Sequence, residues 1–139
     1  MRLWLHECNR VWLDRLIRKE DVDLYNSFVS TAMKEFPSLK PEDVTSDKPE
    51  APLIFTSFIS QCRGHEATLM AVTNLEELNK VLEEKLEEYS EQVVKMDLVL
   101  FTQAMEHVTR IARIIDQPKG HALLVGVGGS GKQSLSRLA

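Results

Sequence analysis

The residues best suited to chemistry form a glycine-rich loop that runs into a lysine near the end of the sequence. The loop consists of Gly126, Val127, Gly128, Gly129, Ser130, Gly131, Lys132, Gln133 and Ser134. It fits the pattern G-x-x-x-x-G-K, in which glycines let consecutive backbone N–H groups face one anion without clashes from Cβ atoms. The lysine of this pattern reaches the β- and γ-phosphates of a nucleotide. The loop therefore predicts a site for ATP or ADP, with Mg²⁺ as a candidate companion ion.

The segments on either side of the loop have the composition that such a site needs. The run His121–Val125 is short and apolar, as in a buried parallel strand, and we expect a strand over residues 121–126. Ser134–Ala139 can start a helix, whose N-terminal amides and dipole would face the phosphates. Strand, loop and helix in this order are the context that makes the motif specific. The alternative, a flexible glycine-rich tail, is disfavoured because an apolar strand seldom precedes such a tail.

One position of the loop departs from the motif. The strict pattern has Ser or Thr directly after the lysine, where its hydroxyl holds Mg²⁺, but Gln133 stands there and Ser134 follows it. A shift of one residue turns a side chain by about 100° around a helix axis, so Ser134 is poorly aimed at a metal. We expect the site to bind nucleotide and to be inefficient in metal-assisted hydrolysis.

Hydrolysis also needs groups that normally follow this loop in the chain. They are an acidic metal ligand on a second strand, a group that positions water and often an arginine. Only residues 135–139 come after Ser134. We therefore assign no catalytic residue, and we expect that this chain by itself does not hydrolyse ATP.

Histidines and cysteines do not form a convincing metal motif. The zinc-protease pattern H-E-x-x-H fails, because Arg10 stands four residues after His6. His6, Cys8, Cys62 and His65 could in principle ligate zinc, but their spacing is irregular and free cysteines are common in ordinary cores. We assign no metal ligands.

Composition excludes several classes of protein. The net charge of −4 argues against a general nucleic-acid binder, and no stretch reaches the roughly 18 apolar residues of a membrane span. The first residues become charged too soon for a signal peptide, and two cysteines do not make a disulfide framework. We expect a cytoplasmic location, with neither nucleic acid nor membrane as a partner.

The first part of the chain predicts a helical unit over residues 1–35. Residues 2–18 read as one amphipathic helix with Leu5, Cys8, Trp12 and Leu16 on a common stripe. A second helix is expected from about Glu20 to Glu35, capped by Asp21 or Asp23. Residues 36–60 are predicted to be a linker, because four of the five prolines fall between Pro37 and Pro52.

Residues 61–139 form the second predicted unit. A helix is expected over Asn74–Val93, where leucines repeat every three or four positions and glutamates occupy the opposite face. That acidic face indicates a solvated surface, with a docking helix as the alternative. Another helix is predicted over Met96–Asp116, with its buried stripe running from Leu98 to Ile115. Gln117–Gly120 then turns the chain into the predicted strand.

Two stretches resemble one family closely. Residues 2–16, R-L-W-L-H-E-C-N-R-V-W-L-D-R-L, resemble the signature R-L-W-x-H-E-x-x-R-V-x-x-D-R-L of axonemal dynein heavy chains, which lies in the helical lid of their third AAA+ module. Met96–Phe101 and Glu106–Ile111 resemble the opening helix of the fourth module. His121–Ala139 resembles the strand and P-loop of that module, including G-V-G-G-S-G-[RK]-Q-S-L. Residues 36–92 match the family mainly in the order and length of their elements.

The resemblance implies a fold, a function and a location. The fold would be mainly α: two helical units plus one β-strand and a P-loop that open an α/β AAA+ domain, a P-loop NTPase. Gly126–Lys132 would hold the phosphates, with Gln133 and Ser134 near the metal. The parent protein would be a microtubule motor of the ciliary or flagellar axoneme, within the cytoskeleton. The partners would be the rest of the heavy chain and its neighbouring AAA+ modules, and microtubules only indirectly.

Two alternatives from other classes remain open. One is a non-enzymatic helical interaction or scaffold fragment that uses the acidic helix as its working surface. The other is a small P-loop protein that is complete in itself. Nucleotide binding that depends on Lys132 would favour the dynein-like hypothesis over the scaffold hypothesis. Steady ATP turnover by the chain would favour the self-contained P-loop protein.

Overall fold

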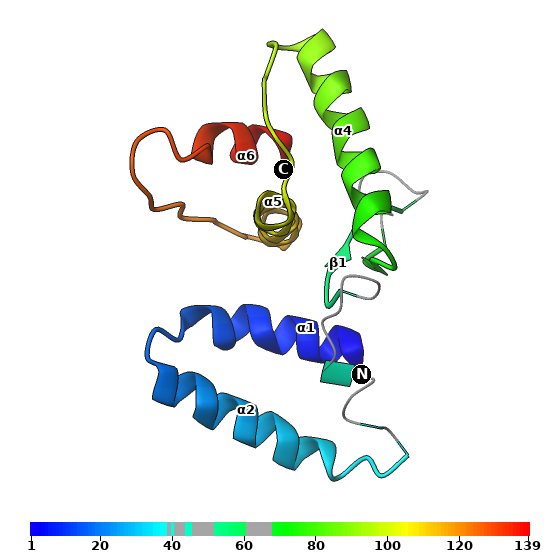
Figure 1. The fold of residues 1–139 in the computed structure, drawn as a ribbon, viewed down its shortest axis with the longest axis vertical. Coiled ribbons are helices and arrows are strands. Elements are labelled where there is room, and N and C mark those ends of the chain that lie inside the picture. Colours follow the sequence, from blue (N-terminus) through cyan, green and yellow to red (C-terminus); the bar gives the residue numbers. More distant parts are fainter. Residues whose placement is uncertain (39, 41–43, 46–51, 61–67) are drawn as a thin grey trace. The chain divides into compact units, whose positions relative to one another are not determined.

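The computed structural model describes residues 1–38, 40, 44–45, 52–60 and 68–139 (Figure 1). The chain divides into two compact units, Met1–Leu53 and Ile54–Ala139. Helices dominate both units, and the described strands are confined to a two-stranded sheet in the second unit. The predicted class, mainly α with few strands, is thus confirmed. Among the described residues, no helix is both long and apolar enough to cross a membrane.

The first unit is built on two helices that run side by side in opposite directions (Figure 1). They are α1 (Arg2–Val11) and α2 (Lys19–Met33), joined through the 3-10 helix η1 (Leu13–Arg15). Burial of apolar side chains holds them together in a small core of Leu5, Val29, Met33 and Val44. Tyr25 of α2 donates its phenolic hydrogen to Asn9 Oδ1 of α1 at 2.8 Å, which adds a polar link between the helices.

The prediction of one helix over residues 2–18 is wrong. The α-helix ends at Val11, and the backbone becomes extended at Leu16, where φ is −82° and ψ is 129°. This break lets α2 fold back onto α1 and bury Val29 and Met33, which a continuous helix would carry away from Leu5. Trp12, expected on the buried stripe, is 56% exposed. Tertiary burial therefore overrides a periodicity that is locally consistent with one helix.

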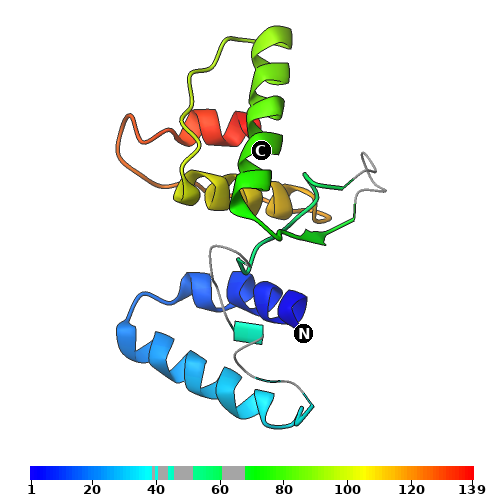
Figure 2. The same cartoon turned by 45° about the vertical axis from the view of Figure 1, so that its right-hand side comes forward.

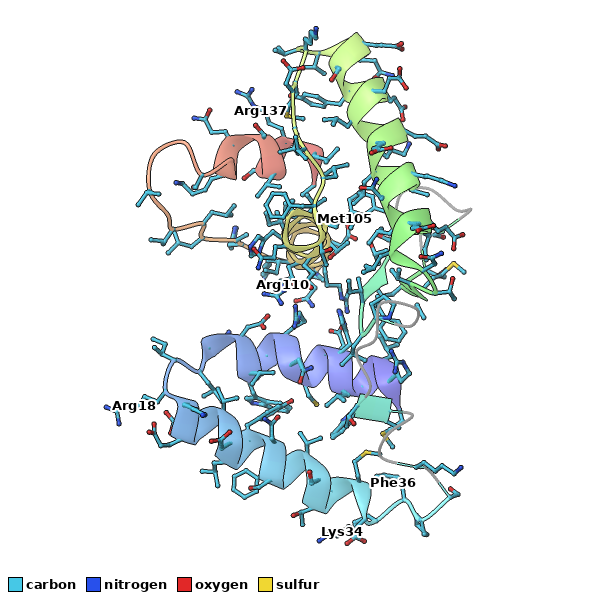
Figure 3. All side chains as sticks on the ribbon, in the orientation of Figure 1. Arg18, Lys34, Phe36, Met105, Arg110 and Arg137 are labelled. Carbon is cyan, nitrogen blue, oxygen red and sulfur yellow. The ribbon has the colours of Figure 1, made fainter. Side chains whose placement is uncertain are left out.

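The second helix agrees with its prediction to within two residues, but its predicted cap is wrong. Arg18 occupies the N-cap position, and no side chain caps the helix by a hydrogen bond. Asp21 instead lies in the first turn beside Glu20, where a negative charge suits the helix dipole. Figure 3 shows Arg18 projecting outward at the turn that precedes α2.

The second unit begins with a short antiparallel pair that the sequence did not predict. Strand β1 (Phe55–Thr56) pairs with β2 (Met70–Ala71), with Phe55 opposite Ala71 and Thr56 opposite Met70. The Val72 N–H extends the pairing by donating to the Ile54 carbonyl at 2.9 Å. Strands of two residues are too short to give a recognisable alternation of polar and apolar positions.

Three helices build the main core of the second unit (Figure 2). They are α4 (Leu75–Gln92), α5 (Thr102–Ile115) and α6 (Lys132–Leu138). Leu78 and Leu82 of α4 are fully buried in this core. Asn74 starts α4 as its N-cap, since its Oδ1 accepts a hydrogen bond from the Glu76 N–H at 2.9 Å. The core also contains Met105 and Val108 of α5 and Leu135 and Leu138 of α6.

The prediction of a helix over Met96–Asp116 is wrong in its first part, because α5 begins at Thr102. Met96, Leu98 and Leu100 pack against the core, whereas Val99 is 79% exposed and Phe101 is also exposed. This alternation has a period of two, as in an extended chain. Read with that period, the sequence would have indicated an extended segment before α5.

The prediction of a strand over residues 121–126 is wrong, because these residues have no regular secondary structure and pair with no described strand. Leu124 packs against the core, but Leu123 and Val125 are 90% and 87% exposed. Apart from Leu124, the side chains of the run that predicted a buried strand are therefore exposed in the described part of the chain.

Candidate phosphate-binding loop

The glycine-rich loop leads from the exposed segment 121–127 directly into α6, as Figure 1 shows. Gly129 and Gly131 have φ values of 77° and 74°, in the left-handed region that glycine adopts without a steric cost. Gly131 is also the N-cap of α6, so the sharp bend falls where the helix begins. Two of the four predicted glycines are thus explained by backbone conformation.

Helix α6 fixes the loop to the core of the unit. Its buried residues Leu135 and Leu138 pack in the same cluster as α4 and α5. Ser136 donates its hydroxyl hydrogen to the Lys132 carbonyl at 2.7 Å, one turn back along the helix. The apolar side of this short helix therefore anchors the residues that follow the glycines.

The side chain of Lys132 closes the loop. Its Nζ donates to the carbonyl oxygens of Gly126 and Val127 at 2.6 and 2.7 Å and to Ser130 Oγ at 3.0 Å. The structure thus brings Gly126, Val127 and Ser130 around the ammonium group of Lys132. A positive charge held at a bend of polar backbone groups suits an anionic ligand.

Three of the four loop glycines face open space. A Cβ added at Gly128, Gly129 or Gly131 would meet no atom within 4 Å. Gly126 differs, because a Cβ there would lie 3.1 Å from Ser130 Oγ and 3.5 Å from Lys132 Nζ. The loop is therefore closely packed at Gly126, whereas the backbone at Gly128, Gly129 and Gly131 is accessible to a ligand.

The two residues expected near a metal lie at the start of α6. The Gln133 side chain is exposed and Ser134 is half-buried. They occupy adjacent helical positions, so their side chains diverge by about 100° around the helix axis. The weak metal site expected from the sequence stays a prediction.

Of the four residues considered as zinc ligands, the structure describes His6 and Cys8. His6 and Cys8 are buried in the first unit, and His6 Nδ1 lies 3.3 Å from Glu7 Oε1. Cys62 and His65 fall outside the described residues. Within the residues that are described, no three His, Cys, Asp or Glu side chains gather as a metal site.

Sequence reasoning missed a groove in the first unit. The groove has a volume of about 480 Å³ and lies between α1 and α2, lined by Trp4, Trp12, Leu24 and Phe28 among other apolar residues. The side chains of these four residues are all substantially exposed. The sequence pattern places Trp12 on the common stripe of the first helix but does not single out Trp4, Leu24 or Phe28.

Comparisons with known proteins give matches over almost the whole chain and, with a family model, over residues 96–139. Residues 96–139 match the family model described as "P-loop containing dynein motor region D4". The chain is 51% identical to "Dynein beta chain, flagellar outer arm" of Chlamydomonas reinhardtii and 44% identical to "Dynein axonemal heavy chain 2" of Homo sapiens, in each case over 99% of its own length. It is 46% identical to "Dynein beta chain, ciliary" of Tripneustes gratilla, also over 99% of its length.

The chain spans about 3% of the length of these relatives. The aligned region covers almost every residue, including the stretch 36–92 where the resemblance was mainly one of order and length. The family model adds a match over the segment that contains α5, the glycine loop and α6. The chain therefore belongs to the axonemal dynein heavy chain family, as a short segment that includes part of motor region D4.

Proposed function

We propose that residues 126–134 bind the phosphates of ATP or ADP, with Mg²⁺ as the accompanying ion. The observation that carries this proposal is the position of Lys132, whose ammonium is held at the bend by Gly126 O, Val127 O and Ser130 Oγ. Gly129 and Gly131 supply the left-handed backbone that such a bend needs. The family match over residues 96–139, whose description names a P-loop, supports the same ligand.

The chemistry of the site favours binding over hydrolysis. An ammonium group and backbone N–H donors can hold phosphate oxygens without any proton transfer. Gln133 replaces the hydroxyl residue that normally holds Mg²⁺, and its amide oxygen is a weaker ligand. We therefore assign binding roles to Gly126–Ser134 and no catalytic role to any residue of this chain.

The role of the whole protein follows from its relatives and is part of the proposal. The matched proteins are named as dyneins of flagellar outer arms, cilia and axonemes. We infer a segment of a motor that drives microtubule-based movement in the cytoskeleton of a ciliary or flagellar axoneme. Its direct partners would be the rest of the heavy chain and the neighbouring AAA+ modules, and it would reach microtubules only through the parent protein.

The division of the chain into modules is also proposed. Residues 1–35 would end the helical lid of the third AAA+ module, residues 36–60 would link the modules, and residues 61–139 would open the fourth. The two compact units, which divide between Leu53 and Ile54, are compatible with this division.

Isothermal titration with Mg-ATP and Mg-ADP tests the site. We expect the full chain to bind and the Lys132→Ala variant to bind at least about tenfold more weakly, because a charge-assisted hydrogen bond contributes about 1.5–3 kcal/mol. Lys95→Ala is a matched control, since Lys95 is exposed and lies in the extended segment before α5. This control should bind like the unchanged chain.

The titration can refute the proposal in two ways. Equal affinities of the unchanged chain and Lys132→Ala would remove the glycine loop as the site. Failure of the unchanged chain to bind either nucleotide would remove nucleotide binding itself. Steady release of inorganic phosphate from ATP by this chain would contradict the assignment of binding without hydrolysis.

A further inference from the structure

All hydrogen-bond donors of the Lys132 side chain are in use within the closed loop. An ammonium group has three N–H donors and no acceptor. Its three bonds go to the carbonyl oxygens of Gly126 and Val127 and to the Ser130 hydroxyl. A phosphate can therefore bind Lys132 only by taking the place of one of these three acceptors.

Ser130 Oγ is the acceptor that a phosphate replaces most readily. Its bond to Lys132 Nζ is the longest of the three, at 3.0 Å against 2.6 and 2.7 Å. It also comes from a side chain that can rotate away, whereas the other two acceptors belong to the backbone. A hydrogen bond between two charged groups is stronger than one to a neutral hydroxyl. Replacement of Ser130 Oγ by a phosphate oxygen keeps the two hydrogen bonds from Lys132 Nζ to the carbonyl oxygens. It exchanges the third hydrogen bond, to the hydroxyl, for a stronger one to the phosphate.

We propose that Ser130 is a positioning residue, which holds the Lys132 ammonium in the empty loop and yields its place to a phosphate of the bound nucleotide. This inference rests on the proposed nucleotide site. The tight approach at Gly126 supports it, because a Cβ there would lie 3.1 Å from Ser130 Oγ. The absence of a side chain at position 126 leaves room for the hydroxyl beside the ammonium.

Removal of the hydroxyl removes a competitor of the phosphate. We expect Ser130→Ala to bind Mg-ADP about two- to twelvefold more tightly, which is the range that one net hydrogen bond corresponds to. Ser130→Gly should give the same result, since it also lacks the hydroxyl. Ser130→Thr keeps the hydroxyl and should restore the affinity of the unchanged chain, which mere disturbance of the loop would not do.

A second hydroxyl in contact with the same lysine provides the control. Ser136 bonds to the Lys132 carbonyl from within α6 and does not touch its ammonium. Ser136→Ala should therefore leave the affinity for Mg-ADP unchanged. Far-UV circular dichroism of each variant verifies that the helices are retained.

The titrations separate two kinds of failure. If Lys132→Ala weakens binding while Ser130→Ala weakens it or leaves it unchanged, the nucleotide site stands and the role of Ser130 is wrong. If Lys132→Ala has no effect, or the unchanged chain does not bind Mg-ADP, the nucleotide site is wrong and the role of Ser130 falls with it.

Discussion

Gly120 at the end of the turn after α5 is the position where an added methyl group should do most harm. A Cβ there would lie 1.7 Å from the Ile114 carbonyl oxygen and 3.0 Å from the Gln117 carbonyl oxygen. Favourable contact between non-bonded heavy atoms begins at about 3.5 Å, so the closest approach is too short by roughly 2 Å. Both neighbours are backbone atoms, and the turn must therefore open in the Gly120→Ala variant.

The cost of that opening can be worked out from the contacts of the turn. The Gly120 N–H donates to the Gln117 carbonyl at 2.9 Å, and loss of this bond costs about 1 kcal/mol. A forced shift of packed backbone costs about 1–3 kcal/mol more. Alanine also restricts the unfolded chain, which offsets about 0.4–1 kcal/mol. We expect Gly120→Ala to lower the free energy of unfolding of the second unit by about 1–3.5 kcal/mol.

Urea unfolding followed by far-UV circular dichroism measures this change. Gly128→Ala is the matched control, because it makes the same chemical change where a Cβ would meet nothing within 4 Å. Its free energy of unfolding should stay within about 0.5 kcal/mol of the unchanged chain, as for other surface substitutions. Equal stability of the two variants would show that the turn is not packed as described.

Two other changes probe the helices. Asn74→Ala removes the Oδ1 that accepts from the Glu76 N–H, so we expect a loss of about 1 kcal/mol in urea unfolding, whereas Asn74→Asp should retain most of it. Burial, followed by the charge of Glu7, raises the pKa of the Cys8 thiol above its ordinary value of 9.0. The folded thiol therefore keeps its proton at a pH where the unfolded thiol has lost it, and the free energy of unfolding depends on pH. The contribution of Cys8 to the stability of the first unit is complete below pH 9.0 and is lost as the pH rises through the raised pKa. The fluorescence of Trp4 and Trp12 during urea unfolding at increasing pH should report this loss in the first unit, and Cys8→Ala should reduce it; an unchanged slope would contradict the assignment to Cys8.

The sequence predicted elements well where the signals are local. Helix α4 begins and ends within one residue of its prediction, because Asn74 caps it and leucines repeat regularly along it. The ends of α1 and α5 were wrong because they depend on distant contacts. Folding of α2 back onto α1 decides the break after Val11, and packing of Leu98 and Leu100 on the core decides the extended segment before Thr102.

The candidate site divides in the same way. Glycine and lysine spacing identified the loop, since the backbone requirements of such a bend are encoded within nine consecutive residues. Spacing could not reveal that the Lys132 ammonium bonds to Gly126, Val127 and Ser130 of its own loop. The bond from Lys132 Nζ to Ser130 Oγ changes the expected role of the Ser130 side chain, from one that helps to hold the phosphates to one that competes with them for Lys132.

The most direct measurement is nitrogen–proton correlation NMR of the full chain during a titration with Mg-ADP. A phosphate held by the glycine loop should shift the backbone amide signals of residues 126–134 saturably, and should leave those of the first unit unchanged. Lys132→Ala should lose the shifts at the same nucleotide concentration. Loop signals that do not move, or shifts centred on the groove between α1 and α2, would contradict phosphate binding at this loop.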